Sequence, residues 1–174
     1  ALGSAWFIND ISWAKDANDE INQLTDFNPK QTVIIDNRFK NYLEGFKPNL
    51  DSNQKIELIS FHPEKMIYAS NSASVNFAVF SEIWYKGNED WKAYIDGNEI
   101  EFIRVNYLLR GLKIPKGNHE IVFKFYPQTH YTGIKISFIF SLLIILMVTA
   151  LIVVHFMKLS LPGLEEDKER DIII

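Results

Sequence analysis

The sequence predicts an α+β fold dominated by β-strands: a β-sandwich or jelly-roll-like module with a short N-terminal α/β segment, followed by one transmembrane helix. Two observations lead to this prediction. Short apolar or alternating runs, separated by turn residues about every 8 to 12 residues, fill the chain from Gln54 to Tyr126 and are typical of a sandwich. Between Lys135 and Lys158 there are then 22 residues without a formally charged side chain. As a helix, this run would span roughly 33 Å, close to the ~30 Å of a bilayer core.

The pattern divides the chain into four parts. We expect an N-terminal α/β segment at residues 1–50 that packs on the module, and the β-sandwich module itself at 51–130. A transmembrane helix is expected at 134–157, followed by a short charged tail at 158–174.

The first part of the chain begins with a predicted strand and helix. Residues 5–14 are rich in aromatic residues and loosely alternate, which predicts a strand. Asp16 or Asn18 is suited to cap a short helix that ends before Pro29. The apolar residues of this helix recur at a spacing of three: Ile21, Leu24 and Phe27.

A second strand and a helical turn are expected next. The β-branched run at 32–35 predicts the strand, and residues 38–45 are expected to form one helical turn with Phe39 and Tyr42 facing inward. Residues 49–53 form a polar connection whose acidic and amide spacing imitates the start of a calcium loop. Such a loop requires glycine at its sixth position and glutamate at its twelfth, and neither is present, so no metal site is expected there.

The module is expected to contain six or seven strands with one clear hairpin. The Asp96-Gly97 pair is a strong signal for a two-residue hairpin turn. The expected strands are 55–61, 66–68, 75–85, 91–95, 99–104, 107–114 and 119–126. The residues expected in the core are Ile56, Leu58, Phe77, Val79, Ile83, Ile121, Phe123 and Phe125.

Composition excludes several kinds of chemistry. The net charge is −4 and no Lys/Arg cluster exists, which argues against a nucleic-acid partner. The absence of cysteine excludes disulfides, thiolate metal sites and cysteine nucleophiles. The four histidines lack the spacing of a zinc site, and no nucleophile elbow or glycine-rich phosphate loop is present. We therefore expect no cofactor, no metal and no catalytic residue in this chain.

Aromatic residues of the predicted strands have two interpretations. In the first, they stack on the apolar face of a sugar ring while nearby charged residues supply hydrogen bonds. The candidate ligand-binding residues are then Trp91, Tyr94, Asp96, Arg104, Tyr107 and Arg110. In the second, the aromatics are ordinary sandwich core, which is the more common role of aromatic residues on strands. The arginines would then pair across strands with Glu82, Glu99 or Glu101.

Several motifs together resemble one family. They are Phe80-Ser-Glu-Ile-Trp-Tyr, Trp91-Lys-Ala-Tyr-Ile-Asp-Gly, Arg104-Val-Asn-Tyr-Leu-Leu-Arg-Gly and Ile114-Pro-Lys-Gly-Asn-His-Glu-Ile-Val-Phe-Lys-Phe. With Asp36-x-Arg38-Phe39 and Tyr131-Thr-Gly133, they are similar to the C-terminal region of YfhO-like bacterial membrane proteins, which are polytopic and related to GT-C glycosyltransferases. The resemblance extends from about residue 2 to 156. The loop 86–90 departs from it, being longer than the compact Gly-Trp turn of the family pattern.

The resemblance implies a parent enzyme that moves a sugar from a lipid-linked donor on the outer face of the membrane. The catalytic acidic residue of GT-C enzymes lies in an early extracytoplasmic loop, and no residue of this sequence corresponds to it. We expect the chain to be a fragment of a longer protein, because residues 5–8 look like the interior of a protein. Its expected partners are the bilayer, a lipid-linked sugar or envelope glycan, and the remaining transmembrane helices of the parent or a larger envelope complex.

The resemblance also gives an expected location and function. The chain is placed in the bacterial inner membrane, with residues 1–133 extracytoplasmic and the tail cytoplasmic. Its expected role is an accessory region that assists sugar transfer to an envelope acceptor. Two alternatives remain open: a non-catalytic, membrane-anchored binding module, and a structural subunit of an envelope complex.

Overall fold

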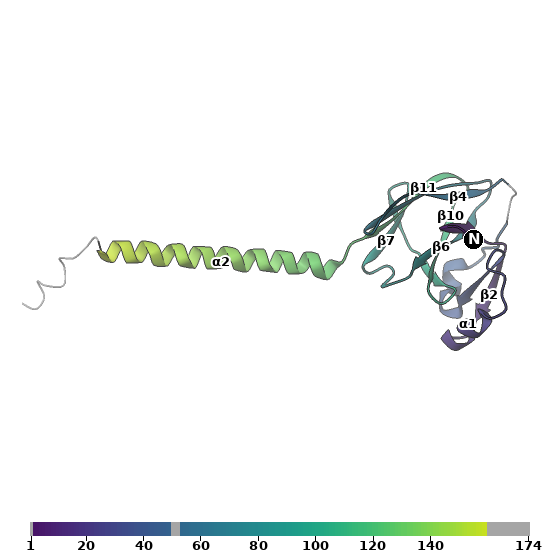
Figure 1. The fold of residues 1–174 in the computed structure, drawn as a ribbon, viewed down its shortest axis with the longest axis horizontal. Helices are drawn as coiled ribbons and strands as arrows, with labels where there is room; N and C mark the ends of the chain where they lie inside the picture. The colour runs from purple at the N-terminus through teal and green to yellow at the C-terminus, as the bar shows by residue number, and fades with distance from the viewer. Residues whose placement is uncertain (1, 50–52, 160–174) are drawn as a thin grey trace, which may run out of the picture. The chain divides into compact units, whose positions relative to one another are not determined.

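The structure is a computed structural model that describes residues 2–49 and 53–159. The chain divides into two compact units, one that ends at Pro127 and one that begins at Gln128. Among the described residues, the strands all lie in the first unit, and the second contains the long helix α2, Gln128–Leu159 (Figure 1). Strands predominate over helices and several sheets are antiparallel, so the predicted fold class is confirmed.

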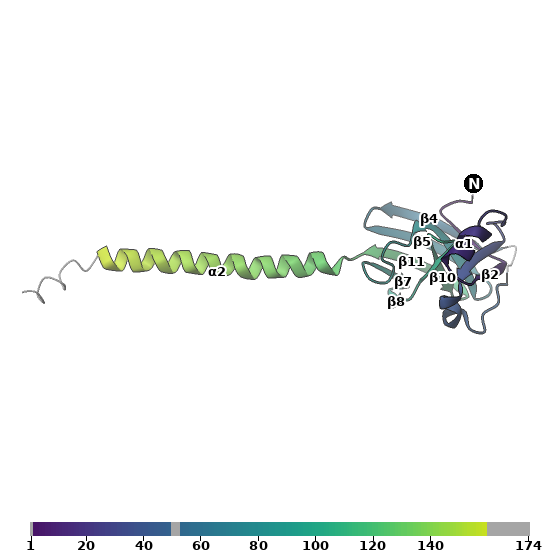
Figure 2. The same cartoon turned by 90° about the horizontal axis from the view of Figure 1, so that it is seen from below.

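Two antiparallel sheets form the sandwich (Figure 2). The four-stranded sheet has, in spatial order, β1 (Ala5–Phe7), β6 (Asn76–Ile83), β10 (Leu109–Ile114) and β9 (Ile103–Val105). The five-stranded sheet has β4 (Lys55–His62), β5 (Lys65–Ser72), β11 (Gly117–Phe125), β7 (Trp91–Ile95) and β8 (Asn98–Ile100).

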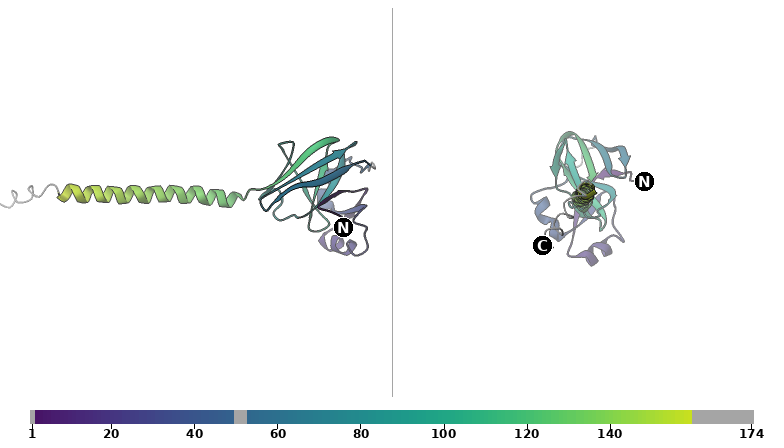
Figure 3. Two further views of the ribbon diagram at one scale, coloured as in Figure 1. Left: turned by 45° about the horizontal axis from the view of Figure 1, so that its top comes forward. Right: turned by 90° about the vertical axis from the view of Figure 1, so that its left-hand side faces the viewer.

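The N-terminal segment adds a small parallel sheet of β2 (Asp10–Ala14) and β3 (Thr32–Asp36) beside the sandwich (Figure 3). Helix α1 (Ala17–Gln23) connects the two strands, and the 3-10 helix η1 (Asn37–Leu43) follows them. Asp16 caps α1 as predicted, because its Oδ1 accepts the backbone N–H groups of Asn18 and Asp19, each at 2.9 Å. Within α1 the buried residue is Glu20, whereas Ile21 is 46% exposed, so the apolar spacing did not identify the buried position.

Two predicted strands are each divided between two sheets. The strand expected at 5–14 breaks after Phe7: β1 joins the sandwich, while the N–H groups of Asn9 and Asp10 both donate to the carbonyl of Gln31 and start the parallel sheet. The strand expected at 99–104 becomes β8 and β9, which lie in different sheets. The chain crosses between them at Phe102, whose side chain is fully buried in the sandwich core.

Strand β6 lies between two cores. Ala78 and Phe80 face the sandwich core. Phe77 and Val79 point the other way, into a second core that the N-terminal segment covers. Phe39 and Tyr42 of η1 pack against this second core, as predicted.

The predicted core is correct except at one position. Phe77, Val79, Ile121 and Phe123 are fully buried, Ile56 and Leu58 pack against the sandwich core, and Phe125 is half-buried. Ile83 is 61% exposed, so its predicted burial is wrong. It shares a face of β6 with Phe77 and Val79 but lies beyond the part of that face that belongs to the second core.

Helix α2 is the candidate membrane span of the described chain. From Gln128 to Lys158 it is long and apolar enough to cross a membrane, and within the described residues it is the only helix with this property. Nearly all of the predicted tail falls on residues 160–174, outside the described residues.

Candidate functional site

The six residues predicted to bind a ligand do not form one site. Trp91 and Arg110 lie together in the sandwich core, and Arg104 and Tyr107 lie together beside the N-terminal segment. Asp96 lies in the β7–β8 turn, and Tyr94 lies on the outer face of the five-stranded sheet.

Trp91 and Arg110 form a stacked pair within an aromatic cluster. The guanidinium of Arg110 is 4.1 Å from the ring centre of Trp91 and 5.2 Å from that of Phe123, and its Nε donates to the carbonyl of Ile83 at 3.0 Å. Arg110 is only 2% exposed, and this burial lowers its pKa to about 10. Trp91 also packs on Phe125, with ring centres 5.2 Å apart. These contacts favour the core interpretation of Trp91 over a sugar-stacking role.

Arg104 and Tyr107 connect the module to the N-terminal segment. One carboxylate oxygen of Glu20 lies 2.6 Å from Nη2 of Arg104, and the other accepts the backbone N–H of Tyr107 at 2.7 Å. Glu20 is fully buried, and desolvation raises the pKa of its carboxyl group. The predicted cross-strand partners of Arg104 are therefore wrong. The actual partner lies 84 residues earlier in the chain, on a helix whose packing the sequence did not reveal.

Asp96 stabilises the predicted hairpin. Its backbone has a φ of +49° and that of Gly97 a φ of +82°, as a two-residue turn of this kind requires. One carboxylate oxygen lies 2.6 Å from Nδ1 of His119, and the other accepts the N–H of Glu120 at 2.9 Å. The hydrogen bond between the two side chains raises the pKa of His119 and lowers that of Asp96. Asp96 thus has a structural partner that the sequence did not indicate.

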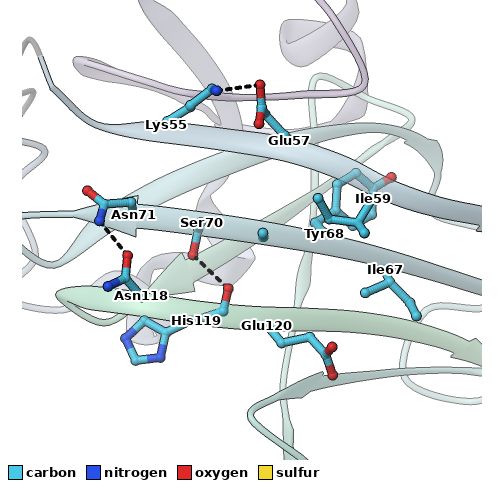
Figure 4. A pocket seen from close by; sticks show the side chains of 11 residues that line it. Lys55, Glu57, Ile59, Ile67, Tyr68, Ser70, Asn71, Asn118, His119 and Glu120 are labelled. Carbon is cyan, nitrogen blue, oxygen red and sulfur yellow. Dashed lines mark hydrogen bonds and ion pairs between the residues drawn. The ribbon is translucent and has the colours of Figure 1, made fainter.

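The outer face of the five-stranded sheet carries a groove of about 610 Å³ (Figure 4). The strand register determines which residues form the bottom of the groove. Ala69 on β5 lies directly between Glu57 on β4 and Glu120 on β11, so a methyl group is flanked by two carboxylates. Because the alanine side chain is short, the middle of the groove stays open between the two longer side chains.

A second row of polar groups borders the first. Asn71 lies between Lys55 and Asn118 in the register, and its amide donates to Oδ1 of Asn118. Nζ of Lys55 is 2.7 Å from a carboxylate oxygen of Glu57. Figure 4 shows these side chains, which come from β4, β5 and β11. At the opposite end of the groove, Ile59 and Ile67 provide an apolar border.

These groups are suited to a ligand rich in hydroxyl groups. Carboxylates accept hydrogen bonds from hydroxyls, and carboxamides both donate and accept them. Tyr94 lies on the same face of the sheet, since its register partner Val122 is paired in turn with Ile67. Of the predicted site residues, Tyr94 is therefore the one on this face. Alternation in the predicted strands 55–61 and 119–126 is compatible with outward-facing Glu57 and Glu120, whereas Asn71 and Asn118 lay outside the predicted strands. Only the strand order brings the four residues together.

A second cavity of about 460 Å³ lies beside the β7–β8 hairpin, and Asp96, His119 and Tyr42 line it. The Tyr42 hydroxyl donates to the carbonyl of Glu101 at 3.0 Å and accepts the N–H of Lys113 at 3.2 Å. Burial raises the pKa of Tyr42 to about 12, so this hydroxyl keeps its proton at neutral pH.

Metal ligation has no candidate in residues 2–49 and 53–159, where no three His, Cys, Asp or Glu side chains form a group suited to a metal ion. The calcium-like spacing at 49–53 includes residues outside the described ones, so the structure does not describe that stretch as a whole.

Comparison with known proteins identifies the family. A family model described as bacterial membrane protein YfhO matches residues 51–137, which is half of the chain. No curated protein and no solved structure matches the chain. The matched residues cover the module from before β4, including every strand of the five-stranded sheet, and continue into α2. The chain therefore belongs to the YfhO family of bacterial membrane proteins.

Proposed function

We propose that this chain is the C-terminal accessory region of a polytopic YfhO-like protein, and that its outer-face groove holds the sugar part of an envelope glycan or of a lipid-linked donor. The observation that carries the proposal is the register of polar groups in the groove, with Ala69 between Glu57 and Glu120 and Asn71 between Lys55 and Asn118.

The groove offers both kinds of contact that a sugar makes. Its carboxylates and carboxamides match ring hydroxyls, while the row of Ile67, Val122 and Tyr94 offers an apolar and aromatic surface to the C–H face of a ring. We assign no acid, base or nucleophile to these residues. In this proposal the chain binds and positions a sugar, and the rest of the parent protein supplies the chemistry.

The membrane arrangement is part of the same proposal. The module lies outside the inner membrane, α2 crosses it, and the tail at 158–174 is placed on the cytoplasmic side. Three basic residues follow the apolar run (Lys158, Lys168 and Arg170), against Lys124 and Lys135 before it, which gives a small positive-inside bias. Protease added to intact spheroplasts should digest the module and spare a C-terminal tag. Digestion of the tag with an intact module would contradict this arrangement.

Binding can be measured by titrating the full chain in nanodiscs with soluble oligosaccharides of glucose, galactose and N-acetylglucosamine. We expect one of them to bind. The double variant Glu57→Gln/Glu120→Gln should then bind at least tenfold more weakly, since a hydrogen bond to a charged group contributes ~1.5–3 kcal/mol.

Glu44→Gln is a matched control, because Glu44 is exposed and lies in the N-terminal segment outside the groove. Binding that the double variant leaves unchanged, or no binding by any of the sugars, would overturn the proposal. If the double variant loses binding but the parent protein carrying it keeps full transfer activity, the non-catalytic binding module is the correct alternative.

A further inference from the structure

One end of the sandwich combines exposed apolar side chains with closely spaced lysines. This end comprises the β4–β5 turn at 62–65, the loop at 84–90 and the last residues of β11, and we call it the β11-end surface. Backbone hydrogen bonds hold the three together: the N–H of Phe125 donates to the carbonyl of Glu64 at 2.8 Å, and that of Tyr126 to the carbonyl of Asp90 at 2.6 Å.

Three lysines lie in one row across this end of the five-stranded sheet. Lys124 on β11 is directly opposite both Lys65 on β5 and Lys92 on β7. Lys92 has a carboxylate partner, Glu99, at 3.0 Å, whereas Lys65 and Lys124 have none within the described part of the chain. Like charges placed directly opposite each other are destabilising. An anionic partner at this row would remove that repulsion.

Large apolar side chains are exposed at the same end of the module, away from the outer face that carries the lysine row: Phe61 is the register partner of the buried Met66, and Tyr85 follows β6 of the other sheet. Phe61, one residue before the β4–β5 turn, is 58% exposed, and Tyr85, in the loop, is 60% exposed. Single exposed apolar residues are common, but exposed aromatic residues and lysines at one end of a module have the composition of a protein surface at a membrane interface.

The short connection between β11 and α2 indicates which anionic groups lie near the lysines. β11 ends at Phe125, α2 begins at Gln128, and the uncharged run of α2 begins at Ile136. The two residues of extended chain between β11 and α2 and the eight helical residues before Ile136 limit the distance from the end of β11 to the hydrocarbon core to roughly 20–25 Å. Phospholipid headgroups occupy the outer part of this interval.

We propose that the β11-end surface binds the anionic phospholipid headgroups of the membrane that α2 crosses. Lys65 and Lys124 contact the phosphates, and the rings of Phe61 and Tyr85 enter the interfacial layer. Glu64 and Glu89 lie on the same two loops, and Lys86 is paired with Asp90 at 3.4 Å, so the attraction comes from the lysine row and not from the net charge of the loops. The proposal does not depend on the groove or on sugar binding.

The absence of native cysteine makes a site-specific test direct. The full chain carrying Tyr85→Cys is labelled with a nitroxide and reconstituted into vesicles of phosphatidylcholine with phosphatidylglycerol, and collisions with a lipid-soluble and a water-soluble relaxation agent are compared. Val75→Cys is the control, because Val75 is also exposed, at 46%, but lies just before β6 begins, at the strand end opposite to the loop that carries Tyr85.

We expect the label at position 85 to be accessible to the lipid-soluble agent and the label at position 75 to the water-soluble agent. In the Tyr85→Cys background, the double variant Lys65→Gln/Lys124→Gln should lower the ratio of membrane-bound to free module about thirtyfold. This estimate follows because each lysine near an anionic surface contributes ~1 kcal/mol to binding. The control pair Lys47→Gln/Lys116→Gln, in other exposed regions, should leave it unchanged.

Equal exposure of both labels to water, or no effect of the two lysine substitutions, would overturn the proposal. In detergent without phosphatidylglycerol, inorganic pyrophosphate is added as a soluble anion. If pyrophosphate restricts the label at position 85 as strongly as the vesicles do, the surface is a site for soluble anions, and the assignment to the bilayer is wrong.

Discussion

The two faces of the five-stranded sheet use the same strands for different purposes. On the inner face, Tyr68 and Phe123 are fully buried and meet edge to face, with ring centres 6.2 Å apart. On the outer face, Ala69, next to Tyr68, and Glu120, next to the buried Ile121, are exposed and border the groove. Residues one position apart along a strand thus belong to the core and to the candidate site. Substitutions on the inner face should therefore lower stability, whereas substitutions on the outer face should weaken ligand binding and leave stability largely unchanged.

The largest effect is expected for Phe123→Ala. The Phe123 ring meets those of Phe80 at 4.9 Å and Phe102 at 5.3 Å, both edge to face. Its removal should lower the free energy of unfolding by ~4–5 kcal/mol, because a large cavity remains in a rigid core. Glu120→Ala, three positions earlier, should change it by less than about 0.5 kcal/mol. Chemical denaturation of both variants tests the comparison, and similar losses for the two would contradict it.

The next largest effect is expected at the buried ion pair between the N-terminal segment and the module. Arg104→Ala leaves the Glu20 carboxylate, which is fully buried, without its cation. The expected loss of stability is ~3 kcal/mol, since breaking one partner of a buried pair strands the other charge. The double variant Arg104→Met/Glu20→Gln should recover part of this loss. A single variant as stable as the wild type would show that the pair does not hold the segment in place.

Trp91 distinguishes the core role from the sugar-binding role. Trp91 is half-buried and stacks on Arg110 and Phe125. Its replacement by alanine should therefore lower the free energy of unfolding by ~2–3 kcal/mol, less than for a fully buried tryptophan. Oligosaccharide affinity should be unchanged, because Trp91 does not line the groove. Intact stability together with weakened sugar binding would reverse the assignment.

A smaller, pH-dependent effect is expected from the Asp96–His119 pair. Its hydrogen bond raises the pKa of His119 in the folded protein, so the stabilisation is complete below the unfolded value of about 6.5 and is lost as the pH rises through the folded value. The lowered pKa of Asp96 adds a second contribution, which is lost only as the pH falls below the ordinary aspartate range. Asp96→Asn should remove the first dependence in thermal unfolding measured from pH 5 to pH 9. If the melting temperature of this variant still falls as the pH rises, the pH dependence comes from other groups.

The sequence predicted the elements whose signals are local. The Asp96-Gly97 turn, the Asp16 cap and the alternation of Ile121 and Phe123 each depend on a few neighbouring residues, and each is present in the structure. The errors came from long-range pairing. Nothing near Arg104 indicated Glu20, and the exposure of Ile83 depends on how far a segment some 70 residues away extends over β6. The groove required the strand order β4-β5-β11, which local patterns do not contain.

The most direct test of the central claim, that the outer face binds a sugar while the inner face maintains the fold, is a residue-resolved titration by NMR. The full chain in nanodiscs, labelled at alanine methyl and asparagine side-chain amide groups, is titrated with the oligosaccharide that binds it. We predict concerted shifts of the Ala69 methyl and of the Asn71 and Asn118 amides, with no shift of the Ala78 methyl in the sandwich core. Saturable binding that leaves Ala69, Asn71 and Asn118 unmoved would contradict the account.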